Sequence, residues 1–364
     1  MNPERALSNG SWPADDRHSI SIIEMLTPIW QRVLRRPSIG VKDDFFEIGG
    51  DPSLARELFI EISRVCGRDL SSTMICQAPT ILTLAALLEK PAVLRWSPLV
   101  LLKAGTEQQP VFLAYGIGGS SVDFIQLARS IPTAHPIYGI EAKGMDGVSE
   151  PLEHVEGMAE FNLDAIRRVQ PHGPYLLIGY SLGGLVMLEM AQRLLEAGEN
   201  VGLLALLDSY PHIRYLPLGQ CMRLMARRAI RRVNDVRRVL MRDTISEIVR
   251  RRRPRLQIVA SRGEGASGPP STGVSLAQAA LQVRDKAVSA LGHYRPRFYK
   301  GKINFVGAET PSYFPQDPAA VWGHLAAELE VETAPGNHVG MIATQFETVA
   351  SLLARYLAEA SSSM

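Results

Sequence analysis

From Pro110 onward the chain alternates short apolar runs with stretches of helical periodicity, and this alternation limits the folds open to it. Each run is rich in Val, Ile and Leu, as in strands that are buried on both faces of a parallel sheet. Helical patterns such as 158–169 and 185–197 lie between the runs, where crossover connections are required. The sequence therefore predicts an α/β domain with a mostly parallel sheet. The expected strands are 111–115, 137–140, 175–178, 203–207 and 303–306.

The chain before Pro110 has a different pattern. Its 364-residue length already favours two domains. Three helical patterns occupy 19–90: the first opens at a capping box of Ser21 and Glu24, the second begins after Asp51, and the third covers 80–88. No convincing strand lies among them, so we expect a small all-α bundle. Residues 1–18 are expected to form a disordered tail and 91–109 a linker, whose 98–102 part could already pack on the next domain, with the α/β domain at 110–364.

The strand and helix alternation is interrupted after Asp208, because the next strand-like run begins only near residue 303. Such a connection is far longer than ordinary ones, and we expect a helical insertion at about 212–298. Its first half is rich in arginine, and its apolar residues are spaced as on amphipathic helices. The favoured interpretation is a lid with outward arginines, of which Arg223, Arg227, Arg228, Arg231 and Arg232 are candidates for holding an anionic group.

Composition excludes several other classes of protein. The formal net charge of +2 gives no reason to expect a nucleic-acid partner. Cys66, Cys76 and Cys221 are an odd number of cysteines without CxxC spacing, which argues against a disulfide framework and a structural metal site. We therefore expect no metal and a reducing, cytoplasmic location. No run approaches the length of a membrane-spanning helix, so no membrane association is expected.

One motif carries chemistry. Gly179-Tyr180-Ser181-Leu182-Gly183-Gly184 follows an apolar run and precedes a helical pattern, which is the context of a nucleophile elbow. The glycines allow the sharp turn and the close approach of neighbouring chain. Ser181 is thus the expected nucleophile, and the alternative is a glycine-rich turn with a surface serine.

A serine nucleophile needs a base and a carboxylate that orients the base. Behind such an elbow these follow in the order Ser, Asp, His. Asp208 ends the apolar run 203–207, so it should lie at the carboxyl edge of a neighbouring strand. His338 lies in a loop between the strand-like 329–333 and a C-terminal helix, and we expect it to be the base. His212, close to Asp208 in sequence, is the rival.

The oxyanion of such a reaction needs two backbone N–H donors. Leu182, directly after the nucleophile, is expected to supply the first. The loop after the strand at 111–115 contains several glycines that would let it fold over the site. We assign the second donor to Ile117, with Gly116 as the alternative.

With these residues, the region from about Pro98 to the end resembles the type I thioesterase domains of nonribosomal peptide and polyketide synthetases. The matching stretches are 112–119, 138–147, 173–184 and 205–208. The resemblance implies an α/β-hydrolase fold in which the insertion forms a lid over an acyl channel. It also implies an acyl or peptidyl thioester as substrate. Tyr115 departs from the family pattern, which usually has a histidine there.

The first domain resembles an acyl or peptidyl carrier protein, through 44–51 and 78–81. That resemblance implies 4'-phosphopantetheine as the cofactor, attached to a serine directly after the Gly-Gly-Asp turn. Pro52 occupies this place, and Ser53 follows it. The arm is therefore expected on Ser53 or on a partner carrier, and the alternative is a degenerate carrier that serves for docking.

The sequence thus predicts a serine thioesterase that hydrolyses or releases an acyl or peptidyl group from a phosphopantetheine thioester, with cyclisation as one route of release. Upstream synthetase modules or a carrier protein are the expected partners. A stand-alone esterase or amidase is one alternative, and a noncatalytic docking protein is the other.

Overall fold

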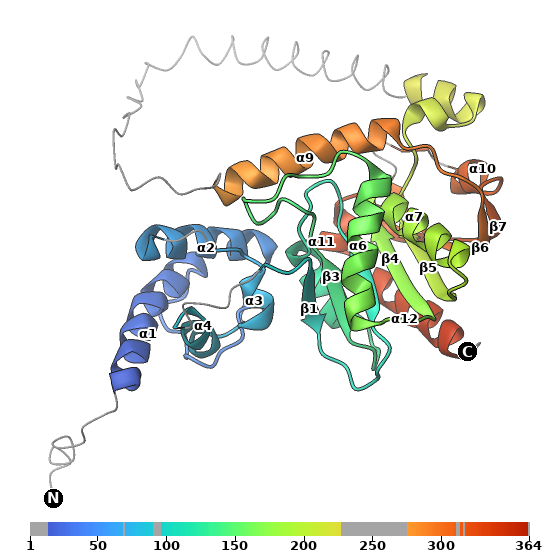
Figure 1. The fold of residues 1–364 in the computed structure, drawn as a ribbon. Coiled ribbons are helices and arrows are strands. Elements are labelled where there is room, and N and C mark those ends of the chain that lie inside the picture. The colour runs from blue at the N-terminus through green and yellow to red at the C-terminus, as the bar shows by residue number, and fades with distance from the viewer. Residues whose placement is uncertain are drawn as a thin grey trace, which may run out of the picture.

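The computed structural model of the chain describes residues 14–67, 70–89, 96–226, 275–310, 314–315 and 317–362. Helices near the N-terminus form one body, and a sheet with flanking helices forms the other (Figure 1). Each body has its own hydrophobic core. This agrees with the change of pattern in the sequence.

The first body contains four helices. They are α1 (Ala14–Val33), α2 (Pro52–Cys66), α3 (Met74–Gln77) and α4 (Ile81–Leu88). The helix expected from Ser21 begins earlier, at Ala14, and the sequence analysis did not predict α3. Helix α2 starts as expected: the Asp51 carboxylate accepts hydrogen bonds from the N–H groups of Ser53 and Leu54 at 2.7 and 2.8 Å. Pro52 takes the first helical position, where its missing N–H is tolerated.

The second body is built on a seven-stranded sheet of order β1-β3-β2-β4-β5-β6-β7. Strand β1 pairs antiparallel with β3, and all the other pairs are parallel. The five expected strands are present, and β1 lies within the 91–109 stretch that the sequence analysis assigned to a linker. The strands are β1 (Leu99–Lys103), β2 (Val111–Ala114), β3 (Ile137–Ile140), β4 (Tyr175–Tyr180), β5 (Val201–Leu207), β6 (Tyr299–Thr310) and β7 (Ala326–Asn337).

Helices cover both faces of the sheet (Figure 1). Helices α6 and α7 pack on each other, as do α5 and α12, and every residue of β2 and β4 is buried between such layers. At one edge of the sheet, α3 of the first body packs against β1. Besides a helix at 218–226, the described helices of the second body are η1 (Val122–Phe124), α5 (Ile125–Ser130), α6 (Val155–Val169), α7 (Leu182–Glu196), η2 (Ile213–Tyr215), α9 (Leu276–His293), α10 (Pro318–Trp322), α11 (Gly340–Ala343) and α12 (Phe346–Ser362).

The expected insertion is described only at its two ends. These contain η2, a helix at 218–226, and α9. Arg223 belongs to the helix at 218–226, whereas Arg227, Arg228, Arg231 and Arg232 lie outside the described residues. None of the helices in the described ranges combines the length and the apolar character that crossing a bilayer requires.

Candidate active site

Ser181 lies at the tip of the turn between β4 and α7. Its backbone has φ 55° and ψ −120°, in the positive-φ region that residues with side chains rarely occupy. The Ser181 N–H donates to the Leu207 carbonyl at 2.9 Å, and the Ser209 hydroxyl donates to the Ser181 carbonyl at 2.6 Å. These two bonds from the neighbouring strand and its loop hold the strained turn in place.

The glycines of the motif are required by close backbone approach. A Cβ at Gly183 would lie 2.2 Å from the Tyr115 carbonyl oxygen, and one at Gly179 would lie 2.4 Å from the Gly183 carbonyl oxygen. No side chain fits at such distances. The motif is therefore a packed nucleophile elbow.

Asp208 and His338 meet as the sequence predicts. Asp208 follows β5, His338 follows β7, and His338 Nδ1 lies 2.7 Å from Asp208 Oδ2. The other carboxylate oxygen of Asp208 accepts from the Ala308 N–H at 3.3 Å, which fixes the plane of the acid. The rival His212 instead accepts a hydrogen bond at Nδ1 from the Arg214 N–H, at 3.4 Å.

Two aromatic side chains that the sequence analysis did not predict hold His338. The ring of Tyr180, the residue before Ser181, stacks on the imidazole with centroids 4.7 Å apart, and its hydroxyl donates to the His338 carbonyl at 2.8 Å. Burial and the nearby Asp208 carboxylate raise the pKa of Tyr180, so its hydroxyl stays protonated and remains a donor. The ring of Phe314 lies 4.8 Å from the imidazole. The only signal for Tyr180 was its place in the motif, and Phe314 had none.

The loop after β2 lies against Ser181. A Cβ at Gly116 would be 3.8 Å from Ser181 Cβ and 3.1 Å from the Tyr180 ring. The loop turns back through a hydrogen bond from the Gly119 N–H to the Gly116 carbonyl at 3.1 Å. Ile117 lies in this turn, and Leu182 is the first residue of α7. Both expected oxyanion donors are thus on segments that border Ser181.

No hydrogen bond joins Ser181 Oγ to His338 among the described residues. Catalytic hydrogen bonds are often long in the absence of substrate and tighten when it binds. Within the same ranges, no group of three or more His, Cys, Asp and Glu side chains is arranged to hold a metal ion. The site thus consists of a strained serine, an oriented imidazole and backbone donors.

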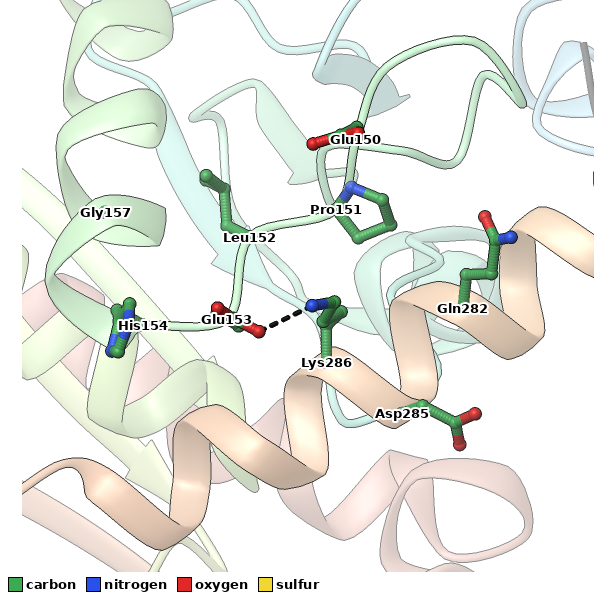
Figure 2. Close-up of a pocket in the computed structure, with 9 residues that line it drawn as sticks. All are labelled: Glu150, Pro151, Leu152, Glu153, His154, Gly157, Gln282, Asp285 and Lys286. Carbon is green, nitrogen blue, oxygen red and sulfur yellow. Dashed lines mark hydrogen bonds and ion pairs between the residues drawn. The ribbon is translucent and has the colours of Figure 1, made fainter.

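A cavity of about 570 Å³ lies between the 150–154 loop, the start of α6 and α9 (Figure 2). Its lining includes Glu150, Glu153, Asp285 and Lys286, and Lys286 is paired with Glu153 at 2.5 Å. None of the residues that line it belongs to the set of Ser181, Asp208 and His338. Its charged side chains lie beside Pro151, Leu152 and Gly157.

The start of α2 determines how the first body fits a phosphopantetheine arm. Pro52 has no hydroxyl, so it cannot form the phosphodiester. Ser53 is exposed, and its Oγ accepts from Arg56 Nη2 at 3.3 Å. A hydroxyl with a guanidinium beside it suits a phosphate ester chemically. The arm therefore fits Ser53 and not Pro52.

Comparison with known sequences identifies both bodies. The model of the thioesterase domain family matches residues 109–357. The model of the phosphopantetheine attachment site family matches residues 24–88. A dimodular nonribosomal peptide synthase of Bacillus subtilis (strain 168) is 37% identical over 198 residues, which are 54% of this chain and 8% of the synthase. An indigoidine synthase of Dickeya dadantii (strain 3937) is 38% identical over 179 residues, 49% of this chain and 12% of that protein. The chain thus spans a small part of the length of these relatives.

A solved structure of a four-domain nonribosomal peptide synthetase bound to AMP and glycine resembles the whole chain. The TM-score is 0.53 at 21% identity, and the match covers 96% of this chain and 27% of that chain. This likeness supports the fold of both bodies in this order. The family match at 109–357 covers more than half of the chain and includes the elbow, Asp208 and His338. The chain therefore belongs to the thioesterase domain family, with a phosphopantetheine-attachment carrier domain in front of the thioesterase domain.

Proposed function

We propose that the chain releases an acyl or peptidyl group from a phosphopantetheine thioester, with Ser181 as nucleophile, His338 as base and Asp208 as the group that orients the base. The observation that carries this proposal is the 2.7 Å contact between Asp208 and His338, beside a serine held at φ 55°. The family of the chain supplies the substrate class. The backbone N–H groups of Ile117 and Leu182 are the proposed oxyanion donors.

The reaction follows from these roles. Ser181 Oγ attacks the thioester carbonyl carbon while its proton passes to His338 Nε2. The developing oxyanion is stabilised by the two backbone donors, and the thiol leaves with the proton from His338. Asp208 stabilises the imidazolium and keeps Nε2 directed toward the reaction. The acyl group is then an ester of Ser181.

The second half of the reaction frees the acyl group. His338 takes a proton from water, and the resulting attack on the ester carbonyl gives a carboxylic acid and regenerates Ser181. A hydroxyl or amine within the acyl chain could take the place of water and give a ring. Product mass separates these outcomes, because the acid is heavier than the ring by one water.

The location of the arm is tested separately. If this chain carries it, the attachment residue is Ser53; if not, a carrier on another chain delivers the substrate. Incubation with a phosphopantetheinyl transferase and coenzyme A, followed by intact-protein mass measurement, should add one arm to wild type and none to Ser53→Ala. An unmodified wild-type chain would assign delivery to another carrier.

The proposed function is tested with Ser181→Ala. This variant should keep the fold and lose about a thousandfold or more of its turnover of acyl-N-acetylcysteamine thioesters. Near wild-type turnover would overturn the assignment. Faster turnover of matched oxygen esters or amides would favour the esterase or amidase alternative. A wild-type chain that reacts with no serine-directed phosphonate would favour the noncatalytic docking alternative.

A further inference from the structure

The carrier domain is held on the thioesterase domain by two arginines. Arg129 of α5 donates from Nη1 to both carboxylate oxygens of Asp44, at 3.0 and 3.1 Å, and its guanidinium lies 4.7 Å over the ring of Phe46. In the opposite direction, Arg56 of α2 reaches across to Asp123, at 2.6 Å. The Arg129 and Asp44 side chains are only 31% and 19% exposed, so this pair is less screened than an ordinary surface pair.

An apolar contact lies between these pairs. Val122 is fully buried and packs into the carrier domain's core, although it belongs to η1 of the thioesterase domain. Phe46 and Cys76 of the carrier domain pack against both cores. Burial raises the pKa of the Cys76 thiol to about 12. Val122 and Asp123, two neighbouring residues of η1, therefore both contact the docked carrier domain, alongside Arg129 of α5 and strand β1.

The segment that bears Val122 and Asp123 is continuous with the oxyanion loop. Ser121 donates its N–H to the buried carboxyl of Glu141 at the end of β3, and the Ala142 N–H donates to the Gly119 carbonyl at 2.9 Å. These bonds tie both halves of the segment 116–124 to the same strand end. The docking half and the loop half of the segment therefore share one anchor at the end of β3.

The segment 116–124 also contacts Tyr180, whose ring stacks on His338. Phe124, the residue after Asp123, packs edge-on against Tyr180 with ring centroids 5.6 Å apart. Tyr180 in turn stacks on His338. The carrier domain is thus connected to His338 through packed side chains, in addition to its connection to the oxyanion loop.

We infer that the segment 116–124 couples carrier docking to catalysis, so that the docked carrier domain holds the oxyanion loop and His338 in their working positions. The inference rests on the proposed function. It goes beyond substrate delivery, because it predicts that undocking slows the reaction of a small soluble thioester that needs no carrier. Couplings between two sites commonly change a binding affinity by about 5-fold to 150-fold, and we expect a loss of kcat of the same order.

The undocking variant is Arg56→Asp with Arg129→Asp, which places like charges opposite Asp123 and Asp44. The matched control is Arg32→Asp with Arg64→Asp. These two arginines pair with Glu61 inside the carrier domain, at 3.1 and 2.5 Å. Both variants make the same change in net charge, and only the first disturbs the contact between the domains.

Docking is measured through Cys76, in a Cys66→Ala, Cys221→Ala background. Cys76 packs against both cores, so undocking should expose its thiol, and a thiol reagent should label it faster. We expect faster labelling and a lower kcat for acyl-N-acetylcysteamine in the undocking variant, with neither change in the control. In the single variant Arg56→Asp, adding Asp123→Arg restores a pair of opposite charges. The labelling rate of Cys76 and kcat should then both return to the wild-type values.

Occupation of the active site should in turn favour docking, which supplies a readout independent of turnover. A phosphonate bound to Ser181 should slow the labelling of Cys76 in the wild-type chain. Faster labelling of Cys76 with an unchanged kcat would overturn the inference, as would equal labelling of the undocking and control variants. If wild type reacts with the phosphonate but turns over no thioester, the proposed function fails, while the Cys76 comparison still tests the coupling.

Discussion

The hydroxyl of Tyr180 gives the most direct test of how His338 is positioned. Tyr180 is 6% exposed and donates to the His338 carbonyl at 2.8 Å. Tyr180→Phe keeps the ring that stacks on the imidazole and removes only this donor. Leaving a buried acceptor without its partner costs about 1–3 kcal/mol, which is an upper range for this part-buried carbonyl. If the whole amount is expressed in the transition state, kcat falls by about 5-fold to 150-fold, since 1.36 kcal/mol corresponds to a factor of ten.

The assay is kcat and KM for an acyl-N-acetylcysteamine thioester, measured together with Tm. Tyr175→Phe is the matched control, because Tyr175 lies at the other end of β4 and its hydroxyl also donates to backbone carbonyls, those of Gln170 and Pro171 at 3.1 and 3.0 Å. Both variants should lower Tm, and only Tyr180→Phe should lower kcat. A kcat within twofold of wild type in Tyr180→Phe would show that the bond stabilises the fold without positioning His338.

Three further predictions follow from the site and its supports. His338→Ala should abolish thioester turnover, while His212→Ala should retain it. Asp208→Asn should lower kcat by a factor of about 10⁴, because the imidazole would take the wrong tautomer. An inactive His212→Ala variant would refute the choice of His338 as the base. Burial raises the pKa of Glu141 from 4.5 to about 7, so the folded chain binds this proton more tightly than the unfolded chain. Relative to Glu141→Gln, the wild-type free energy of unfolding should therefore fall by on the order of 3 kcal/mol between about pH 4.5 and pH 7, and a constant difference in denaturant titrations would contradict this. Gly183→Ala should unfold or inactivate the chain, because its Cβ would lie 2.2 Å from the Tyr115 carbonyl oxygen. Gly292→Ala in α9 has open space around it and should raise the free energy of unfolding by about 0.5–1 kcal/mol. Equal changes of Tm in the two variants would refute the steric argument.

The elements that the sequence predicted are those with a strong local pattern. Buried parallel strands appear as apolar runs in the sequence, so these strands were predicted. Helix α2 was predicted because its sequence contains an N-cap, Asp51, and a glycine that ends it, Gly67. The elbow fixed Ser181, and chain order led to Asp208 and His338. Strand β1 and helix α3 are short and lie near Pro- and polar-rich sequence, which gave no comparable signal.

The side chains that the sequence did not predict are placed by tertiary packing. Phe314 reaches His338 from a loop, and the contact between Arg129 and Asp44 joins residues far apart in the chain. Neither contact has a local signature, because nothing in the neighbouring sequence distinguishes these residues from other aromatic residues in loops or other arginines in helices. The arginine-rich part of the insertion lies outside the described residues, and its role as a lid stays a prediction.

The two outer strands of the sheet differ in how their free backbone groups are protected from other chains. On β7, glutamates at 328, 330 and 332 alternate along the strand, and Glu330 and Glu332 pair with Arg355, so charge discourages edge-to-edge pairing. Strand β1 carries Leu101 with 37% of its surface exposed, and helix α3 of the carrier domain packs against this strand. A thioesterase domain excised without its carrier domain would therefore present an uncovered, apolar edge strand, and self-association through β1 would be the expected consequence of separating the two domains.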